Sequence, residues 1–224
     1  MSNTSHDILF PGVVGQIQAK KQLEFFIEGH KANSTSANIL ISGEKGGGKT
    51  LLCKTFARNL MRSDKSEKKP LIEINCSTIR SISQFINQIY LVHLIDRECS
   101  VLFDEASELP HSLTMALLSL TNNTTNDFNS LIVDGSEIIF DYRKLSLIFA
   151  TTDAQKIFTP LVDRMERISL APYSQEELLE VVRMGLRRGG VSYYDVDQDV
   201  GIRLVSTLRG NPRASQKLAT KLKI

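Results

Sequence analysis

The sequence has 224 residues, of which 42% are hydrophobic and 23% are charged, with a formal net charge of +2. These values suit one sizeable α/β core with a small satellite domain, and they exclude a largely disordered chain. Because the net charge is small, any contact with nucleic acid must come from a local basic patch.

The first predicted elements are an amphipathic helix over 16–30, a buried strand over 37–41 and a second helix from residue 50. The helix over 16–30 places Ala19, Leu23, Phe26 and Ile27 on its inner face. Cys53, Cys76 and Cys99 lie in or beside core elements without disulfide or zinc spacing, so we expect reduced thiols. No segment resembles a secretory signal or a membrane span, and we therefore expect a cytoplasmic protein.

A complete G-x-x-x-x-G-K-T phosphate loop joins that strand to the second helix. Its residues are Gly43, Glu44, Lys45, Gly46, Gly47, Gly48, Lys49 and Thr50. The glycines let successive N–H groups point at phosphates, and the helix that follows adds the positive end of its dipole. We expect Lys49 to reach the β- and γ-phosphates and the Thr50 hydroxyl to hold Mg²⁺. The loop therefore predicts a nucleoside triphosphate site.

A second chemical motif follows a strand over 71–75 and a helix over 81–94. The apolar run 100–103 ends in Asp104 and Glu105, which places two carboxylates at the edge of an α/β sheet where ligands bind. Asp104 is expected to hold Mg²⁺ through its water shell, and Glu105 to orient and polarise the attacking water. The alternative is an ordinary strand end, but the phosphate loop upstream favours a shared metal site.

Two further elements precede the C-terminal part of the chain. Residues 131–140 predict a β-hairpin with an Asp134-Gly135 turn, and residues 146–152 predict a buried strand. Thr152, at the end of that strand, could hydrogen-bond the γ-phosphate or the attacking water. Threonines also end strands for structural reasons alone, and that alternative stays open.

The C-terminal part predicts helices with clear start signals. Ser174 and Glu177 form a capping box that opens a helix to about Arg188, where Gly189 and Gly190 end it. Asn211 is a suitable N-cap and Pro212 a suitable first residue for a last helix, with Arg213 in its first turn. Arg213, Lys217 and Lys221 then form a basic stripe, which is either a solvated face or a contact with nucleic acid.

The order of these motifs resembles the AAA+ ATPases, and among them RuvB, the motor of Holliday-junction branch migration. The resemblance runs from about residue 10 to the end. Its motifs are Gly15-Gln16 before a helix, the phosphate loop, Phe103-Asp104-Glu105, Ala150-Thr151-Thr152, Pro160-Leu161-Val162-Asp163-Arg164 and Gly210-Asn211-Pro212-Arg213.

The resemblance implies an α/β P-loop AAA+ fold: a five-stranded, mainly parallel sheet flanked by helices, plus a small C-terminal helical lid domain. It implies a nucleotide-binding domain over 1–171 and a lid over 172–224, with ATP and Mg²⁺ as ligands. Lys49 and Thr50 match Walker A, Asp104 and Glu105 match Walker B, and Thr152 matches the first sensor. Arg213 matches the second sensor. Leu51 and Pro212 are expected to border the nucleotide, as are Val13, Val14 and Tyr173, which could instead be simple core residues.

Arg164 matches the arginine finger, which would act in trans on the nucleotide of a neighbouring subunit. Arg167 is the nearby competitor, and an ordinary surface arginine is the structural alternative. An arginine supplied by a neighbour makes hydrolysis depend on assembly, so the resemblance implies a homo-oligomer, expected to be a hexameric ring.

The expected function is an ATP-hydrolysing ring that remodels DNA in recombination, repair or replication, with an unidentified recruiting protein and no membrane partner. Two departures from RuvB qualify it. The sequence ends at Ile224 without the winged-helix domain that contacts DNA, and the hairpin over 131–140 is shorter than the one that docks RuvB on its partner. The alternative is therefore a nucleotide-switched loader or regulator, such as a helicase loader or a transposition accessory factor.

Overall fold

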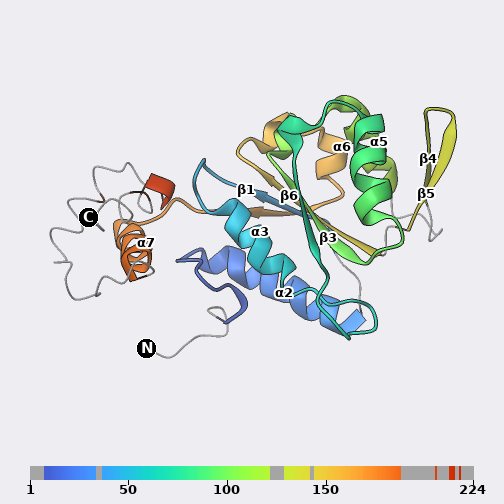
Figure 1. Cartoon of the computed structure of the whole chain (residues 1–224). Helices are drawn as coiled ribbons and strands as arrows, with labels where there is room; N and C mark the ends of the chain where they lie inside the picture. The colour runs from blue at the N-terminus through green and yellow to red at the C-terminus, as the bar shows by residue number, and fades with distance from the viewer. Residues whose placement is uncertain are drawn as a thin grey trace.

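The computed structural model describes residues 8–33, 37–121, 129–141, 144–187, 205, 212–214 and 217. Its centre is a five-stranded sheet in the order β2-β3-β6-β1-β7, in which every neighbouring pair is parallel (Figure 1). The strands are β1 (Ile39–Ser42), β2 (Leu71–Asn75), β3 (Cys99–Asp104), β6 (Leu145–Thr151) and β7 (Glu166–Ser169). The five-stranded parallel sheet expected from the sequence is confirmed.

The strand order brings together segments that are far apart in the sequence. Strand β6 lies between β3 and β1, with Asp104 of β3 opposite Ala150 and Ser42 of β1 opposite Thr151. The ends of the three strands therefore meet at one edge of the sheet. This is the edge where parallel α/β sheets bind ligands.

Helices cover both faces of the sheet and make it a three-layer structure (Figure 1). One face packs against α2 (Ile17–Asn33) and α3 (Lys49–Ala57) through a core that includes Leu23, Ile27, Phe56 and Ile148. In the first helix, Ala19, Leu23 and Ile27 are buried as expected and Phe26 is partly buried. Strands with helices on both faces are apolar along their whole length, which is why β1, β3 and β6 read as continuous apolar runs.

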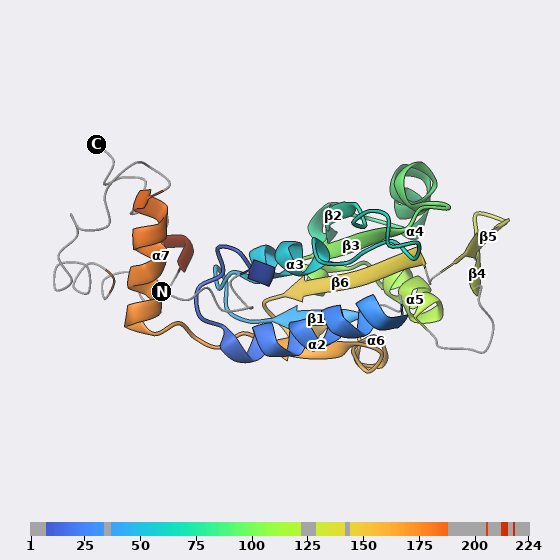
Figure 2. The ribbon, with the colours of Figure 1, turned by 90° about the horizontal axis from the view of Figure 1, so that it is seen from below.

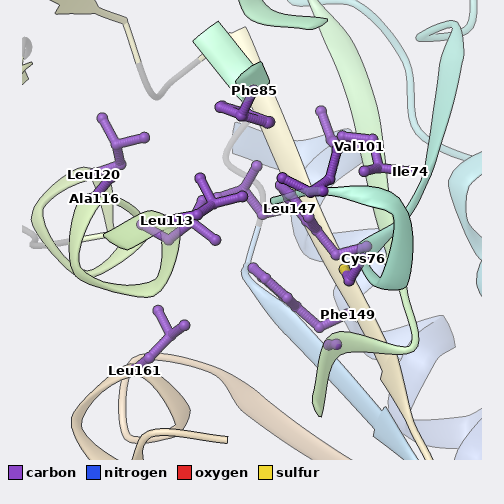
Figure 3. Close-up of a cluster of buried hydrophobic side chains, with 14 of the residues drawn as sticks. Ile74, Cys76, Phe85, Val101, Leu113, Ala116, Leu120, Leu147, Phe149 and Leu161 are labelled. Atoms are coloured by element: carbon purple, nitrogen blue, oxygen red, sulfur yellow. The ribbon is translucent and has the colours of Figure 1, made fainter. Parts of the chain in front are cut away.

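The other face packs against α4 (Ile82–Phe85), η2 (Ile86–Leu94), α5 (His111–Leu120) and α6 (Thr159–Val162). In Figure 3 Leu113 of α5 points toward Leu147 of β6, and Ala116 and Leu120 of the same helix belong to the same buried cluster. Phe149 of β6 stacks on Phe103 of β3, with ring centroids 4.8 Å apart. Single 3₁₀ turns lie at Cys76–Thr78, Ala106–Glu108 and Ala154–Lys156. Cys53, Cys76 and Cys99 are free, buried thiols, as expected.

The helix expected over 81–94 is present, but most of it is a π-helix. A regular α-helical start at Ile82–Phe85 gives way to π geometry over Ile86–Leu94. The wider turn still buries Ile86, Tyr90 and Leu94, which are spaced four residues apart, and Tyr90 donates a hydrogen bond to the carbonyl of Ile139. Helical periodicity in a sequence does not separate α from π geometry when the apolar spacing suits both.

The predicted hairpin is confirmed as β4 (Asn129–Val133) and β5 (Ser136–Phe140), with Val133 opposite Ser136. Asp134 and Gly135 have φ angles of +51° and +80°, as a type I′ turn requires. Figures 1 and 2 place this hairpin at the end of the molecule opposite α7.

Helix α7 (Gln175–Arg187) begins with the predicted capping box. The Ser174 N–H donates to a Glu177 carboxylate oxygen at 2.8 Å, and the Glu177 N–H donates to Ser174 Oγ at 3.2 Å. Pro212–Ala214 is helical, whereas Gly189, Gly190, Asn211 and Lys221 lie outside the described residues. The division at 171/172 stays a prediction. Within the described ranges, no helix is both long and apolar enough to cross a membrane.

Candidate functional site

The phosphate loop has the backbone that its glycines predict. Gly46 and Gly48 have φ angles of +82° and +87°, and the Gly47 N–H donates to the Glu44 carbonyl at 3.1 Å. Gly48 is the N-cap of α3, and it has no side chain with which to occupy the first N–H groups of the helix. Those N–H groups and the helix dipole therefore face the loop, where an anion is stabilised.

Lys49 is buried at the start of α3 and folds back over the loop. Its Nζ donates to the Gly43 carbonyl at 2.9 Å and to the Glu44 carbonyl at 2.8 Å. Burial lowers the pKa of Lys49, the charge of Asp104 opposes this shift, and the nearby charge of Arg213 adds to it. The lowered pKa shows that the ammonium lacks full solvation and would gain from an anionic ligand.

Thr50 and Asp104 join the two chemical motifs. The Thr50 hydroxyl donates to Asp104 Oδ2 at 2.9 Å, although 54 residues separate the two side chains in the sequence. A hydroxyl and a carboxylate are hard oxygen ligands of the kind that Mg²⁺ prefers, so the residues present fit this ion. The convergence of the two motifs on one point, expected from the sequence, is present in the structure.

Glu105 follows the end of β3 in a strained conformation. Its φ and ψ angles of 56° and 46° lie in the left-handed region, which costs a non-glycine residue about 1 kcal/mol or more. Its N–H donates to Asp104 Oδ1 at 3.1 Å, and its side chain is exposed. The strained turn therefore separates a carboxylate beside Thr50 from a second one that faces solvent.

Thr152 is the first residue after β6, and it is exposed. Since β6 lies between β3 and β1, Thr152 stands between the end of the phosphate-loop strand and the strand that carries Asp104. Its neighbour Thr151 is buried and accepts a hydrogen bond from the Asp153 N–H at 3.0 Å. Thr151 thus has a structural partner, while Thr152 is exposed at the carboxyl end of β6.

A cavity of about 300 Å³ lies beside the phosphate loop, a size that suits a small ligand. Of the residues expected to contact the nucleotide, those that line it are Val13, Val14, Gly46, Gly48, Lys49, Thr50, Leu51, Tyr173, Pro212 and Arg213. Gly43, Glu44, Lys45 and Gly47 belong to the loop but do not line the cavity. The lining also includes Gly12, Lys54 and Val181, which the sequence analysis missed. Lys54 lies one helical turn after Thr50, a spacing that could have identified it.

Arg164 lies away from this cavity. It follows α6 and precedes β7, whose first residue, Glu166, is level with Ile39 at the start of β1. The phosphate loop begins at the opposite end of β1. Arg164 Nη1 donates to the Pro160 carbonyl at 2.9 Å, and Arg167 pairs with Asp163 at 2.5 Å. Asp104, Glu105 and Arg213 thus lie near Lys49, whereas Arg164 lies away from it, and the catalytic roles of all these residues and of Thr152 stay predictions.

The sequence matches the model of the ATPase family associated with various cellular activities (AAA) over residues 39–173, which is more than half of the chain. The chain belongs to the AAA family. The matched region runs from β1 through the phosphate loop and Asp104 to Tyr173 of the cavity.

Comparison with individual proteins confirms that this AAA protein is RuvB-like. It is 28% identical over 225 residues to the Holliday junction branch migration complex subunit RuvB of Campylobacter lari, covering 96% of this chain and 61% of that protein. The RuvB of Campylobacter concisus is also 28% identical, with the same coverage. The chain thus spans about three fifths of the length of these curated relatives. The Thermotoga maritima RuvB Holliday junction branch migration motor has the same fold, with a TM-score of 0.72 at 20% identity over 95% of this chain and 64% of that one.

Proposed function

We propose that this protein is a Mg²⁺-dependent ATPase that assembles into a ring, in which a pair of neighbouring subunits is the smallest unit that completes an active site. The ring acts on DNA in recombination, repair or replication. The observation that carries the proposal is the hydrogen bond between Thr50 and Asp104, beside the buried ammonium of Lys49. These three groups are the ones that a bound triphosphate and its metal require.

Each residue at this edge of the sheet has a separate task. The N–H groups of the loop and Lys49 bind the phosphates, and Thr50 and Asp104 hold Mg²⁺. When bound, the ion neutralises charge on the β- and γ-phosphates. Val13, Val14 and Tyr173 border the base, and Arg213 supports the phosphates from the lid side of the cavity.

Hydrolysis needs a base and stabilisation of the transferred phosphoryl group. Glu105 accepts a proton from the attacking water while the water oxygen forms a bond to the γ-phosphorus. The bond between the γ-phosphorus and the β,γ-bridging oxygen breaks, and the products are ADP and phosphate. Thr152, on the adjacent strand end, orients the same water. The Glu105 side chain is exposed, which supports this role because a general base must be accessible to the attacking water. Asp104 is not available for the task, since it is assigned to Mg²⁺.

The position of Arg164 supports ring assembly. Four strand residues, at about 3.3 Å each, separate the level of Ile39 from Gly43, so Arg164 lies roughly 13 Å or more from its own loop. An arginine side chain is too short for that distance. Arg164 can instead reach the cavity of a neighbouring subunit, where it would stabilise charge on the γ-phosphate.

The proposed DNA substrate rests on the relatives, whose names describe branch migration at Holliday junctions. The partner that recruits the ring remains unidentified. The relatives named above are RuvB proteins, and they favour this proposal over the loader or regulator alternative.

The test is ATP hydrolysis by the purified chain, with and without duplex, forked and four-way-junction DNA, together with its mass in a slowly hydrolysed ATP analogue. We expect hydrolysis that depends on concentration, increases with DNA and disappears in Lys49→Ala. Lys31→Ala, an exposed lysine on α2 paired with Glu28, is the matched control and should hydrolyse ATP normally. A protein that binds no nucleotide, or an active monomer, would contradict the proposal.

A further inference from the structure

The segment over 12–16 touches both the nucleotide cavity and the chain that leads into the lid. Gly12, Val13 and Val14 line the cavity, Gly15 lies against Glu177 of α7, and Gln16 contacts Ala171 in the linker between β7 and α7. Figure 2 shows this linker running past the start of α2 on its way to α7. One short segment therefore lies between the ligand and the lid.

Gln16 binds the linker at two points. Its Nε2 donates to the Ala171 carbonyl at 2.8 Å, and its Oε1 accepts from the Ala171 N–H at 3.0 Å. The side-chain amide thus pairs with both backbone groups of one residue, as a neighbouring strand would. Such a pair of hydrogen bonds fixes both the distance and the relative orientation of Gln16 and the linker backbone, since both bonds form only when the two amide groups are aligned.

The Gln16 side chain also lies close enough to Tyr173, two residues beyond Ala171, to oppose part of the rise in the Tyr173 pKa that burial causes. Tyr173 lines the cavity, and its hydroxyl lies close to the loop: a Cβ added to Gly48 would meet it at 3.2 Å. Burial raises the pKa of Tyr173, so its hydroxyl remains a neutral hydrogen-bonding group at physiological pH. Gln16 therefore lies beside a linker residue, Tyr173, that lines the cavity and packs against the apolar cluster of α7.

The backbone around Gln16 is constrained in ways that serve this contact. Gln16 is only 6% exposed and has a φ angle of +54°, an unusual conformation for a residue with a side chain. Gly15 has a φ angle of +58°, and a Cβ there would lie 1.9 Å from Glu177 Oε1 at the first turn of α7. Lys20, one turn later on α2, donates to the Val13 carbonyl at 2.6 Å. The segment is thus pinned to α2 on one side and packed against α7 on the other.

We propose that Gln16 is a positioning residue that couples occupancy of the nucleotide cavity to the position of α7, and so to the placement of Arg213. A ligand that contacts Val13 and Val14 moves or orders segment 12–16. Because Gln16 hydrogen-bonds Ala171 at two points, the linker and the lid move or become ordered with that segment. Gln16 itself does not line the cavity. The inference rests on the proposed nucleotide site, and it adds the contact by which binding reaches the lid.

The test measures lid position and nucleotide binding in the same samples of the full chain. Cysteines introduced by Glu28→Cys on α2 and Arg187→Cys on α7 carry distance labels, because both sites are exposed and the three native thiols are buried. The label distance is recorded with no nucleotide, with ADP and with a slowly hydrolysed ATP analogue. Affinity comes from titration with a fluorescent ADP, and kcat and KM come from ATP hydrolysis.

We expect Gln16→Met, which keeps the length of the side chain and removes its hydrogen bonds, to abolish the nucleotide-dependent change in label distance. Its kcat should fall roughly 10-fold or more while KM changes little, because a misplaced group affects the transition state more than ground-state binding. Gln16→Glu keeps the acceptor for the Ala171 N–H and loses the donor to its carbonyl, so it should show a partial loss. Gln18→Met, the same substitution at an exposed position of α2, should behave as the wild type.

A wild-type distance change in Gln16→Met would overturn the inference, and so would a wild-type protein that binds nucleotide without moving its lid. If Gln16→Met fails to fold, Gln16→Glu decides by the same measurement. A wild-type protein that binds no nucleotide contradicts the proposed function itself, and the titration separates that outcome from the other two.

Discussion

Mixing two inactive variants tests whether Arg164 acts across a subunit boundary. Lys49→Ala removes the ammonium of the cavity and leaves Arg164 intact, whereas Arg164→Ala leaves the cavity intact and removes the guanidinium. Loss of such an arginine lowers kcat about 10³-fold or more in related phosphoryl-transfer sites. Each variant alone should therefore be nearly inactive.

The expected activity of the mixture follows from the geometry. Arg164 lies at the edge of the sheet opposite its own loop. If it acts in trans, as we propose, a working site needs an intact cavity from one subunit and an intact Arg164 from the next. In a mixture of equal amounts that assembles at random, a working site forms where an Arg164→Ala subunit supplies the cavity and a Lys49→Ala neighbour supplies Arg164. This pairing occurs at about one quarter of the interfaces, so independent sites would recover about one quarter of wild-type hydrolysis.

The assay is steady-state phosphate release at a constant total protein concentration while the ratio of the two variants is changed. Recovery should be greatest at equal amounts and absent at either end. A mixture no more active than its components would refute action in trans. Arg167→Ala is the matched control, since Arg167 is exposed and paired with Asp163, and its loss should leave hydrolysis near the wild-type rate.

Three other predictions concern the site and its supports. Glu105→Gln should retain ATP binding, measured by titration, and lose hydrolysis by about 10²–10⁴-fold, because the base is gone while Lys49, Thr50 and Asp104 remain; wild-type turnover would exclude Glu105 as the base. Gly48→Ala should lower the free energy of unfolding by about 1–2 kcal/mol, because the φ angle there is +87°, and it should also weaken nucleotide binding. Its control is Gly29→Ala in α2, where an added Cβ meets nothing within 4 Å, so thermal unfolding should show a gain in stability of up to about 1 kcal/mol. Burial raises the pKa of Cys99 to about 11 and of Cys76 to about 12, and raises that of Cys53 further, so none of the three should react with a thiol reagent at pH 8 until the protein unfolds. The stability that these thiols contribute is complete below the pKa of the unfolded thiol and declines as the pH rises above it, since the unfolded chain then holds fewer protons.

Local motifs were predictable because their geometry depends on neighbours in the sequence. The phosphate loop needs left-handed backbone at Gly46 and Gly48, the hairpin needs it at Asp134 and Gly135, and the capping box needs Ser174 three residues before Glu177. Each requirement involves only a few consecutive residues, so the amino acids reveal it directly. The AAA family membership and the resemblance to RuvB followed from the order of such motifs along the chain.

The remaining contacts depend on how distant segments meet. Strand β6 enters between β3 and β1, and that crossover places Thr152 beside the phosphate loop and Arg164 at the far edge of the sheet. Val181 reaches the cavity because α7 packs there, and Gln16 meets Ala171 across 155 residues of sequence. No local sequence pattern predicts these pairs of residues, because the pattern that forms a helix or strand does not determine which distant segment that element packs against. The amino acids alone thus identify the chemistry of a nucleotide site, while the packing of distant segments places its lid contact and keeps Arg164 away from its own phosphate loop.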